Sequence, residues 1–246
     1  MKGNILVVIP MQKELQFFLQ ACARHGIPFE HAALGKLPAV RFPGLGMTLA
    51  RGGTGKAQFA LQTQHLLDAD PDWKTVVCAG AAGALSETLS IGDVVVATST
   101  VEHDYRNKMN DSSRTIKSKN PKPPELLPLP SFVGDSEAVA GLQRAALSVG
   151  PFRVHFGIVA SGDEDIVHGD RKKSLRRETG ALAVAWEGAG GARACKFSGI
   201  PYVEVRGVTD TADQHACSDF EDHLELAMGN ITELITGWRI QETKPE

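Results

Sequence analysis

The chain has 246 residues, of which 42% are apolar and 22% carry a charge, and its formal net charge is −3. This length and apolar content suffice for one large domain with a sizeable core, and the near balance of charge excludes a global attraction to nucleic acid or to an anionic membrane. No run approaches the roughly 20 apolar residues of a membrane helix. The four cysteines form no cluster with metal-ligand spacing, so we expect buried thiols in a reducing cytosol and no metal site.

The predicted elements begin with a short buried strand at residues 5–9 (ILVVI). A helix follows at 12–26, where apolar residues recur with helical spacing and Gly26 marks the end. The apolar run at the N-terminus is too short for a signal peptide and has no small-residue cleavage site. We therefore expect a cytoplasmic protein.

The middle of the chain alternates in the same way. A helix is predicted at 55–69, after the glycine-rich stretch 52–55, and strands are predicted at 75–83 and 93–101. The segment 106–131 interrupts this alternation with lysines, serines and five prolines, which predicts a long surface loop. The loop is either a solvated connector or a substrate lid or interface arm.

The last part of the chain repeats the alternation and completes the predicted fold. Its elements are a helix at 135–150, strands at 152–161, 180–190 and 201–209, and a helix at 222–241. β-Branched runs between amphipathic helices predict an α/β fold, with three α/β/α layers and a twisted, mixed and largely parallel central sheet. We expect residues 1–240 to form a single domain and 241–246 to fray.

Acidic and small residues follow several of the predicted strands. The residues at these strand ends are Glu14, 80–85, 161–166, Glu187, and the pair Asp210 and Asp213. Ligands of open α/β sheets bind beyond the carboxyl ends of the strands. Each acid alone could be a helix-start acid or a cap. Several acids that converge on one glycine-lined site suit hydrolysis at an anomeric carbon, where one acid protonates the leaving group and another activates water.

Five stretches carry a family resemblance. They are IPMQKE (9–14), CAGAAGALSETLSIGDVVVA (78–97), SGD (161–163), VAWEGAG (184–190) and RGVTDTAD (206–213). Together they resemble the nucleoside phosphorylase/hydrolase superfamily, in its branch of bacterial methylthioadenosine/S-adenosylhomocysteine nucleosidases. The resemblance runs over roughly residues 4–238, and the second stretch is its longest and most specific match.

The resemblance implies a phosphorylase/hydrolase-like fold and a purine nucleoside N-glycosidase for a 5′-modified nucleoside. It implies that Glu14 activates water, that Glu187 binds the ribose hydroxyls and that Asp210 assists protonation of purine N7. A purine protonated at N7 departs neutral, and burial or nearby negative charge would raise the pKa of such an acid. Asp213 is interpreted as a residue that orients the loop.

The resemblance also implies the wider binding site and the assembly. The residues expected to contact the substrate are Met11, Ala81, Ala82, Gly83, Asp165, Ile166, Trp186, Glu187 and Phe220. No cofactor and no metal are implied. The family's loop after the His103-Asp104 pair completes the neighbour's pocket, so we expect a homodimer.

Several positions depart from the family pattern. Trp186 replaces a methionine, Ala185 replaces an acid, and Asp165 replaces the aromatic residue that stacks on the base. Ring stacking contributes roughly 0.5–1.5 kcal/mol beyond burial, so adenine is less strongly indicated. The polar, basic segment 106–108 replaces apolar contacts to the 5′ group. It favours a charged or larger 5′ group, of the futalosine type or an adenosyl by-product, unless these side chains face solvent.

Two rival functions follow from the same residues. The first is a phosphate-dependent phosphorylase, but no arginine accompanies Glu14 after the first strand, and a carboxylate there would repel phosphate. The second is a non-catalytic nucleoside-binding protein, which the loss of the stacking aromatic favours. The joint presence of Glu14, Glu187 and Asp210 argues against it.

Overall fold

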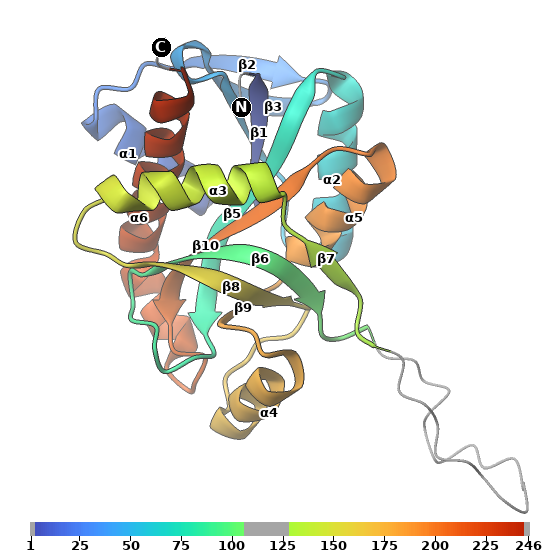
Figure 1. Ribbon diagram of the computed structural model, residues 1–246, viewed down its shortest axis with the longest axis vertical. Coiled ribbons are helices and arrows are strands. Elements are labelled where there is room, and N and C mark those ends of the chain that lie inside the picture. Colours follow the sequence, from blue (N-terminus) through green and yellow to red (C-terminus); the bar gives the residue numbers. More distant parts are fainter. Residues whose placement is uncertain (1–2, 106–127, 244–246) are drawn as a thin grey trace, which may run out of the picture.

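The computed structural model describes residues 3–105 and 128–243, and one mixed sheet forms its middle layer (Figure 1). The strands are β1 (Asn4–Ile9), β2 (Glu30–Leu34), β3 (Leu37–Phe42), β4 (Met47–Arg51), β5 (Trp73–Ala84), β6 (Val94–Glu102), β7 (Ser131–Val133), β8 (Val154–Ser161), β9 (Ala183–Ala185) and β10 (Tyr202–Asp210). The helices are α1 (Gln12–Arg24), α2 (Lys56–Ala69), α3 (Ser136–Ala145), α4 (Gly169–Thr179), α5 (Gly188–Ser198) and α6 (Ala216–Thr243), with short 3-10 turns η1 (Pro43–Leu45) and η3 (Ala146–Ser148). None of these described helices is both long and apolar enough to cross a membrane.

The sheet combines an open half with a closed half. Its strand order is β10-β6-β8-β9-β5-β1-β4-β3-β2, and a further pairing of β10 with β5 closes five of these strands into a ring. β1 lies between β4 and β5 and is parallel to both. β10 is parallel to β5 but antiparallel to β6. The predicted mixed sheet in an α/β fold is therefore confirmed.

The two faces of the sheet are covered by different helices. In β1, Ile5, Val7 and Ile9 pack into a core that also holds residues of α1, α3 and α6. Leu6 and Val8 point to the opposite face, where they pack with residues of α2 and α5. Burying each such side chain contributes roughly 1.5–3 kcal/mol. The continuous apolar run of β1 is thus the signature of a strand buried on both faces.

The prediction of a strand over 180–190 is wrong for most of its length. The strand β9 covers only Ala183–Ala185, and the helix α5 begins at Gly188. Small residues here serve close helix packing instead of strand pairing, because a Cβ on Gly190 would lie 2.3 Å from the carbonyl oxygen of Lys56 at the start of α2. Composition alone does not separate these two uses of glycine and alanine.

Other elements escaped the sequence analysis or extend beyond it. Strands β2, β3 and β4 occupy residues 30–51, where β2 is a largely exposed edge strand without a clean alternation. Helix α4 buries only Leu175 and so lacks an apolar stripe. Helix α6 begins at Ala216, earlier than predicted, and runs through residues 241–243, which were assigned to the fraying tail. Of the predicted loop 106–131, residues 106–127 lie outside the described residues and Ser131 begins β7.

Candidate active site

A cavity of about 470 Å³ opens where β1, β5, β8, β9 and β10 end. Every residue that the family resemblance assigned to catalysis or to substrate contact lines it. These residues are Met11, Glu14, Ala81, Ala82, Gly83, Asp165, Ile166, Trp186, Glu187, Asp210 and Phe220. The fold thus brings together side chains that are up to about 200 positions apart, through the general tendency of α/β sheets to bind ligands at their carboxyl ends.

Glu14 is held in the first turn of α1 by two backbone N–H groups. Its Oε2 accepts a hydrogen bond of 2.8 Å from the N–H of Met11, and its Oε1 accepts one of 2.8 Å from the N–H of Ala81 on β5. The residue is only 2% exposed. Burial, together with the nearby carboxylate of Glu187, raises the pKa of Glu14 from its ordinary 4.5 to about 7, although the two N–H donors and Arg206 oppose this rise.

Glu187 lies at the corner between β9 and α5. Its Oε1 accepts a hydrogen bond of 3.2 Å from the N–H of Gly55, and its Oε2 lies 3.3 Å and 3.4 Å from the two terminal nitrogens of Arg206. Burial raises the pKa of Glu187, and the charge of Arg206 counteracts this. Ser161 fixes the corner, because its hydroxyl donates to the carbonyl of Trp186 at 2.7 Å and accepts from the N–H of Ala189 at 2.9 Å.

Arg206 is a cavity residue that the sequence analysis did not assign to the site. It is 1% exposed, and its Nε donates to the carboxylate of Glu204 at 2.7 Å. Its terminal nitrogens face Glu187, the carbonyl of Ala81 at 3.2 Å and the sulfur of Cys78 at 3.4 Å. The signal was available, since Arg206 and Glu204 are charges inside an otherwise apolar strand, and such charges are almost never buried unless they are paired.

Asp210 is the last residue of β10, and its side chain accepts hydrogen bonds from residues next to it in the sequence. Its Oδ2 accepts a hydrogen bond of 2.8 Å from the hydroxyl of Thr209, and its Oδ1 accepts one of 2.9 Å from the N–H of Ala212. Burial raises the pKa of Asp210, and these two donors oppose the rise. A Cβ at position 83 would lie 2.7 Å from Oδ1, so Gly83 is required for this close approach. Ala212 adopts a left-handed conformation (φ 51°), which costs roughly 1–2 kcal/mol and is held by this hydrogen bond.

The remaining predicted residues differ in exposure. Ile166 is buried, Asp165 is exposed, and Trp186 is 37% exposed with its side chain on the cavity wall. Trp186 and Phe220 are the aromatic residues among the described cavity-lining residues. Asp213 does not line the cavity and instead accepts hydrogen bonds from the hydroxyl of Thr211 and the N–H of His215, both within its own loop.

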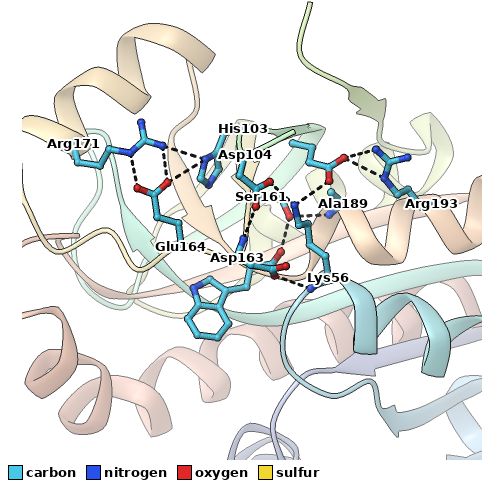
Figure 2. A network of polar contacts seen from close by, with 11 residues as sticks. Lys56, His103, Asp104, Ser161, Asp163, Glu164, Arg171, Ala189 and Arg193 are labelled. Atoms are coloured by element: carbon cyan, nitrogen blue, oxygen red, sulfur yellow. Dashed lines mark hydrogen bonds and ion pairs between the residues drawn. The ribbon is translucent and has the colours of Figure 1, made fainter. Parts of the chain in front are cut away.

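A second set of charges surrounds the start of α2, and we call Lys56, Glu102, Asp104, Asp163 and Arg193 the rim network; Lys56, Asp104, Asp163 and Arg193 are labelled in Figure 2. The side-chain ammonium of Lys56 contacts Glu102 at 3.0 Å and also contacts Asp104. The backbone N–H of Lys56 donates to the carboxylate of Asp163 at 2.8 Å. Arg193 binds the other oxygen of Glu102, and the N–H of Asp163 donates to Asp104 at 2.9 Å. The network fixes the start of α2, directly after the residue whose N–H contacts Glu187.

The charges around the cavity limit the anions it could hold. Among the described residues that line the cavity, Arg206 is the one lysine or arginine, and all of its nitrogens face acceptors of the protein. No group of three or more potential metal ligands occurs within residues 3–105 and 128–243. The cavity therefore offers a ligand carboxyl groups with raised pKa, which can exchange a proton or accept a hydrogen bond.

Comparisons with known proteins identify the family of the chain. A family model described as the phosphorylase superfamily matches residues 4–237. A 5′-methylthioadenosine/S-adenosylhomocysteine nucleosidase of Bacillus pumilus is 31% identical over 190 residues, which are 76% of this chain and 78% of the relative. The enzyme of the same name from Actinobacillus succinogenes is 31% identical over 196 residues, 79% of this chain and 80% of the relative.

Solved structures extend the similarity to almost the whole chain. The Neisseria meningitidis nucleosidase of the same name, in complex with methylthio-immucillin-A, matches with a TM-score of 0.79 at 25% identity and covers 96% of this chain and 98% of its own. A mutant of the Helicobacter pylori nucleosidase, with 5′-methylthioadenosine in its active site, matches with a TM-score of 0.80 at 25% identity, over 98% of this chain and 100% of its own. A Helicobacter pylori futalosine hydrolase shares the fold, with a TM-score of 0.79 at 24% identity, and covers 98% of this chain and 98% of its own.

Proposed function

Because this chain belongs to the phosphorylase superfamily, we propose that it is an N-glycosyl hydrolase that releases the base from a 5′-modified purine nucleoside. The substrate class is that of methylthioadenosine and S-adenosylhomocysteine, after which the relatives are named. The observation that carries the proposal is one cavity lined by three buried carboxyl groups, those of Glu14, Glu187 and Asp210, whose pKa values are all raised.

In the proposed reaction, Glu14 is the general base. Its pKa of about 7 leaves it half ionised near neutral pH, where a base of matched strength accepts a proton from water efficiently. The resulting hydroxyl adds to the anomeric carbon as the bond from that carbon to the purine nitrogen breaks. Glu187 accepts hydrogen bonds from the ribose hydroxyls and favours the positive charge that develops on the sugar.

Asp210 is the proposed acid on the opposite side of the reaction. Burial raises the pKa of Asp210. In the proposed step the protonated carboxyl donates its proton to N7, so that the base leaves as a neutral molecule. Glu14 gains one proton from water while Asp210 gives one to the base, so the protein's total proton count is unchanged. The products are the free base and a ribose derivative with a hydroxyl at its anomeric carbon.

The environment of Arg206 supports hydrolysis over phosphorolysis. A phosphorylase needs cations that are free to bind phosphate beside the sugar. Here the guanidinium is 1% exposed and is engaged by Glu204 and Glu187, and the adjacent Glu14 would repel an anion. Water meets neither obstacle.

We also propose that the protein is a cytoplasmic homodimer. Leu61 on α2, Val133 on β7 and Phe197 on α5 are 73%, 81% and 84% exposed, and these elements neighbour one another on one side of the molecule (Figure 1). Large apolar side chains exposed on neighbouring elements suit an interface between two copies of the chain. The free cysteines of the described chain fit a reducing compartment. Sedimentation should give a dimer for the native chain and a monomer for Phe197→Glu, and a native monomer would refute the assembly.

The test of the activity is base release from methylthioadenosine, S-adenosylhomocysteine, adenosine and inosine, each with and without phosphate. We expect phosphate-independent release, and a loss of roughly 10²- to 10⁴-fold in Asp210→Asn, the range for loss of a general acid. Asp93→Asn is the matched control, because Asp93 is a buried carboxyl engaged by Arg153 and His155 outside the cavity. Release that requires phosphate would make the protein a phosphorylase, and tight binding without turnover would make it a binding protein.

A further inference from the structure

We propose that Glu204 is a positioning residue that acts through Arg206: it fixes the guanidinium and takes up part of its charge, and it thereby sets how readily Glu14 accepts a proton from water. The catalytic part of this inference rests on the proposed function. Glu204 does not line the cavity, and none of its carboxylate oxygens is accessible to solvent.

The geometry begins with the pleat of β10. Residues two apart on a strand point to the same face, so Glu204 and Arg206 lie side by side, and Oε1 of Glu204 accepts a hydrogen bond of 2.7 Å from Nε of Arg206. Oε2 of Glu204 accepts a hydrogen bond from the hydroxyl of Thr100 on β6. Both oxygens therefore have partners, as a buried carboxylate requires.

The packing around Glu204 ties it to the residue that follows Glu187. A Cβ at position 188 would lie 2.2 Å from Oε2 of Glu204, so only glycine permits α5 to start directly against this carboxylate. The hydroxyl of Tyr202 donates to the carbonyl of Gly188 at 2.8 Å and so fixes the turn between β9 and α5. Glu204 thus supports both Arg206 and the turn from which Glu187 reaches into the cavity.

One guanidinium serves more than one carboxylate in this cluster. Besides Glu204, the titratable residues that interact with it from the surrounding elements are Glu14 on α1, Cys78 on β5, Glu187 at the start of α5 and Tyr202 on β10. Burial raises the pKa of both Cys78 and Tyr202 well above the ordinary value, so these two groups stay neutral. The charges that remain are Arg206 and the carboxylates.

Arg206 lies closer to Glu204 than to Glu187. Its bond to Glu204 is 2.7 Å, whereas its two contacts with Glu187 are 3.3 Å and 3.4 Å. Because Glu204 engages the guanidinium more closely, it leaves Glu187 less fully neutralised. The remaining negative charge of Glu187 is one of the causes that raise the pKa of Glu14.

The decisive variant is Glu204→Gln. Glutamine keeps an acceptor for Nε of Arg206, and its amide nitrogen can donate to Thr100, so the shape and hydrogen bonds persist while one negative charge is removed. The acid limb of the pH profile of kcat/KM should move to lower pH by roughly one unit, because an additional fraction of the Arg206 charge then acts on Glu187 and Glu14. The plateau should fall a few-fold, since a less basic carboxylate is a weaker general base.

Two further variants separate positioning from structural support. Glu204→Asp retains the charge and should leave the acid limb where it is, even where its shorter side chain lowers the plateau. Asp93→Asn removes a buried carboxylate that faces Arg153 and His155 instead of Arg206, and it should also leave the limb in place. A merely structural role for Glu204 would lower the plateau of Glu204→Gln without moving its limb, and that result would overturn the proposal.

A readout that needs no turnover keeps this test apart from the test of the function. NMR titration of the Glu14 side-chain carboxyl should show a lower midpoint in Glu204→Gln than in the native chain, and an unchanged midpoint in Asp93→Asn. A native chain that releases no base from any nucleoside, but shows this shift, would refute the proposed function and retain the role of Glu204. Release of base by the native chain, together with an unchanged Glu14 midpoint in Glu204→Gln, would retain the proposed function and refute the role of Glu204.

Discussion

Two charged clusters in different surroundings meet at Glu187. Glu187 belongs to the first, which we call the buried cluster and which consists of Glu14, Glu187, Glu204 and Arg206, and it meets the rim network through the N–H of Gly55 at the start of α2. The side chain of Arg206 is 1% exposed, whereas that of Arg193 is 45% exposed. Water reaches part of the rim network, at Arg193 and Asp104, although Glu102 is buried there, whereas it is nearly excluded from the buried cluster, so ion pairs in the two clusters have unequal consequences.

The two clusters act in different ways, one on the position of a carboxylate and the other on its proton affinity. The rim network acts through the backbone, because Lys56 fixes the start of α2 and the N–H of the preceding residue contacts Glu187. The buried cluster acts through charge, because burial and the neighbouring Glu187 raise the pKa of Glu14 to about 7. The rim network thus sets the position of Glu187, and the buried cluster sets the proton affinity of Glu14.

The largest expected effect comes from removing the cation of the buried cluster. Arg206→Met leaves the carboxylates of Glu204 and Glu187 buried without their partner, which should lower the free energy of unfolding by about 3–5 kcal/mol. The double variant Glu204→Met/Arg206→Met removes one of these orphaned charges and should be more stable than Arg206→Met alone. Urea unfolding at pH 7 measures both. A loss below about 1 kcal/mol in the single variant would contradict the contrast between the clusters.

The next effect is a pH dependence of stability that originates in Glu14. Its pKa is raised on folding from 4.5 to about 7, so the folded state holds this proton more tightly, and the contribution is full below pH 4.5 and lost as pH rises through 7. The free energy of unfolding should fall by on the order of 3 kcal/mol across that range. Glu14→Gln cannot titrate and should show a flatter curve. Parallel curves of the two proteins would exclude Glu14 as the source.

The smallest effect is expected at the rim. Lys56→Met breaks a partly exposed contact with Asp104 and leaves the buried Glu102 with Arg193 as its partner, so it should lower the free energy of unfolding by only about 1 kcal/mol. KM should rise a few-fold as the start of α2 loosens beside Glu187, with no movement of the acid limb of the pH profile. Arg24→Ala, which removes an exposed pair with Glu225, is the control and should change neither quantity. A shifted limb in Lys56→Met would mean that the rim also sets proton affinity.

The amino-acid sequence was sufficient to predict the central strands of the sheet and most of the residues that line the cavity. Continuous apolar runs identified β1, β5, β6 and β10, since strands buried on both faces need such runs. Acids placed directly after strands, together with the family motifs, identified Glu14, Glu187 and Asp210 as neighbours in one site. They line one cavity because the carboxyl ends of neighbouring strands lie together.

Only the tertiary structure decided which charges share a partner. Nothing in the periodicity of β10 indicates that Glu204 contacts Thr100, and Lys56 is 46 residues from Glu102 in the sequence. The exposed edge strand β2 and the polar helix α4 were missed for a related reason, because they bury too little to leave a pattern. A sequence reports which faces are apolar, whereas the partner of a buried charge depends on how those faces are packed together.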